Sequence, residues 1–227
     1  MIPDEHLNNG IFSGTDLAIR NALGLREGRQ LWHKTDQALV GKTVRTDTLI
    51  NLVRELYQIV ATNLRDRAPS VENWRWKPQT YIGRENTSPE VILERAVAIL
   101  AEQGQLDAIG KWCNQIPVAS GLVDHKSDKR AAVDLARIAG ERLDLYELKW
   151  KSDTPIYAAF EILLYGLAYL LCRANQTKFG YDRLDTMQVK NLTLNVMAPT
   201  AYYESLDLAW LQTGLDVGIR NVSQQVL

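Results

Sequence analysis

Alternation of apolar and polar residues predicts a strand in the middle of the chain, from Leu143 to Trp150. On this strand Glu147 and Lys149 lie on the same face as two leucines. Charged side chains on an otherwise apolar strand face are costly to bury unless they are paired or hold a metal ion. The stretch therefore indicates a functional site.

A second short strand is predicted from Ala131 to Ile138, with Asp134 on a face that is otherwise apolar. The intervening Gly140-Glu141 pair favours a turn. We therefore expect the two strands to form a hairpin that brings Asp134 towards Glu147.

Apolar spacing and capping residues predict the remaining elements. Helices are expected over about 13–23, 26–40, 47–67, 88–103, 155–173 and 202–222, and strands over about 111–123 and 193–197. The apolar face expected for the helix after Ser88 is formed by Ile92, Leu93, Ala96, Ile99 and Leu100. Glu94 lies off this face, but apolar residues also flank it one turn away, so we expect it to point into the site. The alternative is a solvated glutamate on an ordinary amphipathic helix.

This order of elements predicts an α/β fold with a central mixed β-sheet flanked by helices, preceded by a helical extension. We expect residues 1–85 to form the extension and a connector, and residues 86–227 to form the core. The extension has no evident set of catalytic residues. Its expected role is contact with a protein partner or with a second copy of the chain.

Composition is typical of a soluble globular protein, with 46% hydrophobic and 23% charged residues. The net charge of −1 argues against a strongly basic protein that coats nucleic acid without selectivity. Two distant cysteines suit a reducing cytosol. The amino terminus lacks the layout of a signal peptide, and no apolar run is expected to span a bilayer. The expected location is cytoplasmic, with no membrane contact.

The connector from Glu72 to Asn86 is rich in aromatic and basic residues. Trp74 and its neighbours would stack on bases and touch phosphates. The residues assigned to nucleic-acid binding are Trp76, Lys77, Arg84 and Lys151. The alternative is that these aromatic residues seal the joint between the extension and the core.

The core pattern, a helix with Glu94, strands with Asp134 and then E-x-K, a helix and a strand, resembles the PD-(D/E)xK nuclease superfamily. The resemblance implies a restriction-endonuclease-like core. Asp134, Glu147, Lys149 and Glu94 match the family's catalytic positions, and the three acids match its metal ligands. Glu161 and Tyr165 resemble its supporting Q-x-x-x-Y pair, with glutamate in place of glutamine, and Val133 stands where the motif has proline.

Through this resemblance we expect a nuclease that hydrolyses phosphodiester bonds with Mg²⁺, or Mn²⁺ in its place, on DNA rather than RNA. Independently of the family, carboxylates suit such hard cations, and an ion would offset their mutual repulsion. Two alternatives remain open. The first is that Glu147 and Lys149 form a salt bridge on an exposed sheet face. The second is that the fold is a catalytically inactive module that binds nucleic acid or protein.

Overall fold

The computed structural model describes residues 10–25, 41, 43–65, 67, 69–81, 88–122, 131–151, 154–204 and 206–227. The helices are α1 (Thr15–Ala22), α3 (Thr46–Leu64), α4 (Pro89–Glu102), α5 (Pro155–Ala174), α6 (Gln176–Phe179) and α7 (Ala209–Val226). The strands are β1 (Lys111–Pro117), β2 (Ala132–Ala139), β3 (Arg142–Leu148) and β4 (Asn191–Met197). Short 3₁₀ helices cover Gly10–Phe12, Asp107–Ile109, Asp185–Met187 and Thr200–Tyr202.

The four strands form one mixed sheet in the order β1-β2-β3-β4. Neighbours β1, β2 and β3 are antiparallel, whereas β4 runs parallel to β3. The expected hairpin is confirmed, because Ala139 pairs with Arg142 across a two-residue turn. Gly140 adopts a φ of 59° in that turn, a value that glycine reaches without steric cost. The predicted α/β class with a mixed, helix-flanked sheet is therefore correct.

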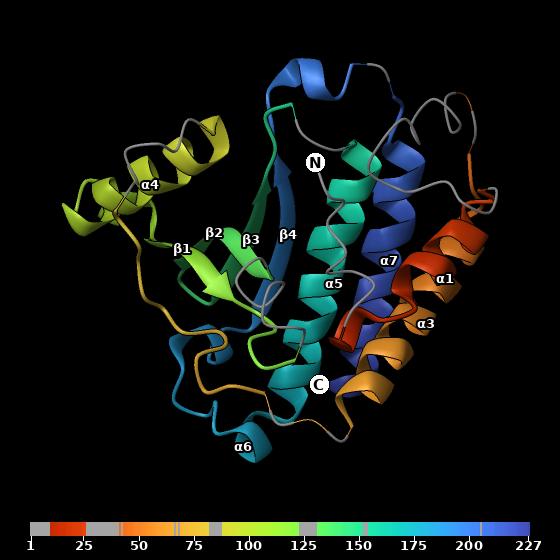
Figure 1. The fold of residues 1–227 in the computed structure, drawn as a ribbon, viewed down its shortest axis with the longest axis horizontal. Helices are drawn as coiled ribbons and strands as arrows, with labels where there is room; N and C mark the ends of the chain where they lie inside the picture. The colour runs from red at the N-terminus through yellow and green to blue at the C-terminus, as the bar shows by residue number, and fades with distance from the viewer. Residues whose placement is uncertain are drawn as a thin grey trace.

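Helices lie on both sides of the sheet (Figure 1). One face of the sheet packs against α5, which is followed outward by α7, α3 and α1, while α4 contacts β1. Helix α5 begins at Pro155, where the Thr154 hydroxyl accepts a hydrogen bond from Tyr157 N, as its sequence pattern predicts. Nearly every residue of α5 is buried, which explains why its apolar residues run all round the helix.

Helix α5 also corrects an expectation about membranes. By length and by a mean hydropathy of 1.6, it is long enough and apolar enough to span a bilayer. Within this structure, however, it is almost entirely buried by protein, as in the core helix of a soluble protein. The cytoplasmic compartment stays a prediction.

The amino-terminal helices pack directly on the rest of the chain. Two glycines of α7 allow close approach of α3: a Cβ on Gly214 would lie 2.3 Å from Leu49 Cδ1, and one on Gly218 would lie 2.7 Å from Val53 Cγ2. Buried residues of α1 and α3 join those of α5 and α7 in one hydrophobic cluster. The expected division at residues 85/86 stays a prediction.

Two details of the expected helices are wrong. On α4 the buried residues are Glu94 and Ala98, whereas Ile92 and Leu93 are 46% and 42% exposed. The helix packs on β1 with its glutamate side, where Gln115 Nε2 donates a hydrogen bond to Glu94 Oε2. Helix α7 begins at Ala209, seven residues later than predicted. The helix expected over 26–40 lies outside the described residues.

Candidate active site

Three polar side chains lie in a row across the strands β1, β2 and β3. In the β1/β2 register Asn114 pairs with Leu135 and Ile116 with Val133, so the intervening Gln115 comes opposite Asp134. The β2/β3 register, continued by one residue beyond the Leu135–Tyr146 pair, places Asp134 opposite Glu147. Opposing residues on antiparallel strands share a face of the sheet, so the row lies on one face. The hairpin thus brings the two predicted acids together.

Lys149 adds a positive charge to this row just beyond the end of β3. Its amide N donates to Met197 O at 3.0 Å, which continues the pairing with β4. Its Nζ lies 2.8 Å from Glu147 Oε1 and 2.9 Å from Glu161 Oε2. The Tyr165 hydroxyl donates to Glu161 Oε1 over a long 3.5 Å. Helix α5 therefore supplies the second carboxylate that holds the ammonium in place.

Glu94 reaches the row from α4 through Gln115. Gln115 Nε2 donates to Glu94 Oε2 at 2.6 Å, and the glutamate is only 2% exposed. Its Oε1 lies 3.4 Å from an Arg95 nitrogen and has no hydrogen-bond partner. Gln115 has a φ of 50°, a conformation that non-glycine residues seldom adopt and that costs energy. Side-chain and backbone geometry thus both mark Gln115 as part of the site.

Sequence reasoning missed Gln115. An amide side chain inside an expected strand carries no charge signal, and its place opposite Asp134 follows only from the strand register. The one sequence feature that could have pointed to Gln115 is its position in the predicted strand that precedes the strand with Asp134.

Burial raises the pKa of Asp134 to about 7, although the side chain keeps some contact with solvent. Two interactions oppose the rise: Leu148 N donates to Asp134 Oδ2 at 2.8 Å, and the Lys149 charge favours the ionised carboxylate. The negative charges of Glu161 and Glu94 push the pKa up further. Three charges, from the end of β3, from α5 and from α4, therefore act on this one carboxyl.

The pKa of Glu147 is also raised well above its ordinary value. Burial is the largest cause, followed by the charges of Asp134 and Glu161, while Lys149 acts in the opposite direction. Burial likewise raises the pKa of Glu94. The acids are close enough to hinder one another's ionisation, as expected for carboxylates that share one site.

Helix α4 makes a second contact near this site. Glu90, one turn before Glu94, accepts a hydrogen bond from Trp150 N at 2.7 Å. The Trp150 side chain is 47% exposed and Lys151 is exposed. The contact ties the end of β3 to the helix that carries Glu94.

The structure describes Trp76, Lys77 and Lys151, three of the four residues assigned to nucleic-acid binding. Lys77 and Lys151 are exposed, while Trp76 is half-buried and packs against the hydrophobic core. Trp74 is fully buried, so the expectation that it stacks on bases is wrong. Arg84 lies outside the described residues. For Trp74 and Trp76, the packing alternative describes the structure better.

The donor chemistry of the cluster suits a hard divalent cation, because carboxylate oxygens are its preferred ligands. Within the described residues no three His, Cys, Asp or Glu side chains are grouped so as to hold a metal ion. Glu147 is instead paired with Lys149. Mg²⁺ commonly binds through one or two carboxylates and keeps several waters, and Asp134 and Glu147 offer two carboxylates of this kind. Glu94 Oε1 accepts no hydrogen bond, but it forms an ion pair with Arg95 at 3.4 Å.

Comparisons with known proteins show no relative. No protein-family model, no curated protein and no solved structure matches the chain. The function must therefore be argued from the contacts of the site itself.

Proposed function

We propose that this chain is a metal-dependent nuclease with a PD-(D/E)xK core, which hydrolyses phosphodiester bonds of nucleic acid, with DNA as the preferred substrate. One observation carries the proposal: Asp134 lies opposite Glu147 on paired strands, with Lys149 2.8 Å from the glutamate. The order α4-β1-β2-β3-α5-β4 and the mixed sheet support it, since the resemblance implies the same succession of elements.

In this proposal Asp134 and Glu147 would hold Mg²⁺ or Mn²⁺. Glu94, the third ligand that the resemblance implies, contacts the site through Gln115. The bound ion would supply a Lewis acid that polarises the phosphodiester and lowers the pKa of an attacking water. Lys149 would orient that water or stabilise the negative charge that builds on the phosphate. Its distance of 2.9 Å from Glu161 supports a positioning role for that glutamate, which Tyr165 in turn contacts.

A second candidate function is a non-catalytic module of the same fold that binds nucleic acid or protein. The observation that favours it is the pairing of Lys149 with two carboxylates, which satisfies its charge without a metal or a phosphate. The net charge of −1 also gives the chain no overall attraction for nucleic acid.

Cleavage of end-labelled oligonucleotides separates these candidates. Wild-type protein is incubated with single-stranded DNA, double-stranded DNA or RNA, and with Mg²⁺, Mn²⁺ or EDTA. We expect metal-dependent cleavage of DNA that falls by about 10²-fold or more in Glu147→Gln and Lys149→Met. The matched control is Glu141→Gln, because Glu141 is an exposed residue of the hairpin turn, paired with Lys190.

Two outcomes would reject the nuclease. Cleavage that survives Glu147→Gln unchanged would place the activity elsewhere or in a contaminant. Absence of cleavage of every substrate, by a folded protein with either metal, would favour the non-catalytic module.

A further inference from the structure

Strand β4 forms one edge of the sheet, and its outer side carries main-chain groups available for pairing. Asn191 N donates to Glu141 O and Met197 O accepts from Lys149 N, so the odd-numbered residues of β4 direct their main chain towards β3. By strand alternation, the N–H and C=O groups of Leu192 and Leu194 point outward. No strand in the described part of the chain pairs with this edge.

The outer edge is closed at only one point. The Tyr203 hydroxyl donates to Val196 O at 2.8 Å and so occupies the last outward carbonyl of the strand. An open row of main-chain donors and acceptors remains before it, centred on Leu194. Such a row is a template for an added strand.

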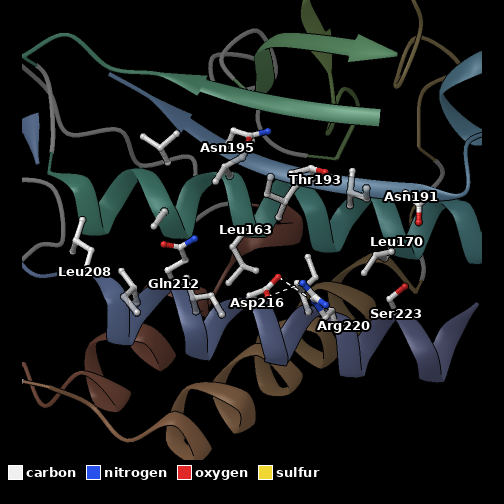
Figure 2. Close-up of a pocket in the computed structure, with 18 of the residues that line it drawn as sticks. Leu163, Leu170, Asn191, Thr193, Asn195, Leu208, Gln212, Asp216, Arg220 and Ser223 are labelled. Atoms are coloured by element: carbon white, nitrogen blue, oxygen red, sulfur yellow. Dashed lines mark hydrogen bonds and ion pairs between the residues drawn. The ribbon is translucent and has the colours of Figure 1, made fainter. Parts of the chain in front are cut away.

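A groove of about 1090 Å³ runs beside this edge. Figure 2 shows β4 on one side, α7 on the other and α5 behind them, with Leu163 and Leu170 between the strand and α7. Apolar side chains of β4, α5 and α7 line its interior, and Gln212, Ser223 and the Asp216–Arg220 ion pair line its α7 side. An apolar trough beside an unpaired edge combines the two features that a bound strand requires.

We propose that this groove binds an extended segment of another protein, which pairs with β4 as a fifth, antiparallel strand. Residues that lie opposite Leu192 and Leu194 would exchange main-chain hydrogen bonds with them and share their face of the sheet. That face is turned towards α5, since Leu194 Cδ1 would lie 2.6 Å from a Cβ on Gly166. The bound segment is therefore apolar at alternate positions and polar between them.

A second copy of this chain does not fit the groove as an occupant. Pairing between two β4 edges would join seven residues of each copy, against about 20–30 residues on each side of a stable interface. A single extended strand needs only the open edge of β4 and the apolar trough beside it, and this inference is independent of the nuclease proposal.

The probe that tests this inference is a fluorescein-labelled nine-residue peptide with leucine and threonine at alternate positions. Binding to the full-length protein is followed by fluorescence anisotropy. Two further peptides carry N-methyl groups, one on its leucines and one on its threonines. In antiparallel pairing the leucine N–H groups face β4 and the threonine N–H groups face solvent. Methylated leucines therefore block the peptide edge that pairs with β4, whereas methylated threonines block the opposite edge.

We expect saturable binding that falls at least tenfold when the leucines are N-methylated and changes less than twofold when the threonines are. In the protein, Ile219→Arg fills the groove and should abolish binding. The matched control Thr213→Arg places the same side chain on an exposed position of α7 outside the groove and should bind normally.

Three results would overturn the inference. The first is no binding of the unmodified peptide at millimolar concentration. The second is an equal effect of both methylation patterns, which would mean apolar contact without strand pairing, or the reverse effect, which would mean parallel pairing. The third is concentration-dependent dimerisation of the protein that Ile219→Arg abolishes, because the occupant would then be a second copy.

Discussion

Replacing Asp134 with asparagine tests the electrostatics of the site most sharply. The raised pKa means that the folded protein binds this proton more tightly than the unfolded chain. The resulting stability is fully present below pH 3.8, the ordinary pKa, and is lost as the pH rises through about 7. Asparagine carries no charge and still offers an oxygen to Leu148 N, which now donates to the aspartate at 2.8 Å. The variant should therefore escape this loss of stability at high pH.

The magnitude follows from the size of the pKa shift. A shift of about three pKa units, at 1.36 kcal/mol each, gives an upper limit of about 4 kcal/mol. Partial solvent contact and the neighbouring Lys149 reduce this value, because asparagine also loses the attraction to that ammonium. We expect Asp134→Asn to raise the free energy of unfolding by about 1–3 kcal/mol at pH 8 and to leave it nearly unchanged at pH 4.

Urea denaturation in EDTA, followed by circular dichroism at pH 4 and pH 8, measures this difference. The matched control is Asp107→Asn, which changes an exposed aspartate in the same way and should alter stability little at either pH. A variant that is less stable than wild type at pH 8, or a difference that does not depend on pH, would refute the reasoning.

Three other substitutions test separate contacts. Gln115→Ala removes the 2.6 Å hydrogen bond to the buried Glu94 and should lower the free energy of unfolding by about 1–3 kcal/mol in urea denaturation. An unchanged value would mean that this hydrogen bond does not stabilise the fold. Gly214→Ala adds a Cβ 2.3 Å from Leu49 and should cost about 1–3 kcal/mol by thermal melting, whereas no loss would show that α3 does not pack so closely. Lys149→Met leaves two buried carboxylates without their ammonium, so it should lower the free energy of unfolding by about 3–5 kcal/mol at pH 8, measured by calorimetry. This loss should be smaller at pH 5. An equal loss at both pH values would contradict the ion pairs.

Local patterns in the sequence were sufficient to predict the hairpin that carries the two central acids. Apolar and polar residues alternate around Asp134 and around Glu147, and Gly140-Glu141 lies between the two stretches. Only one turn and one strand register then bury the apolar face. The beginning of α5 was equally local, since Thr154 and Pro155 together form a helix start.

Features that depend on tertiary contacts could not be predicted in this way. The exposure of Ile92 reverses the usual interpretation of an amphipathic helix, because α4 packs on β1 through Glu94, whose partner there is the polar Gln115. The strained backbone of Gln115 has no signature in the residue type. The groove beside β4 lies between elements far apart in the sequence, so no single stretch of residues predicts it.

The central claim is that Asp134 and Glu147 form one site for a divalent cation. Isothermal titration of wild-type protein with Mn²⁺, compared with Glu147→Gln and with the exposed control Glu141→Gln, tests it most directly. We predict saturable Mn²⁺ binding to wild type and to the control, and at least tenfold weaker binding to Glu147→Gln. Equal binding by all three proteins, or none by wild type, would contradict the claim.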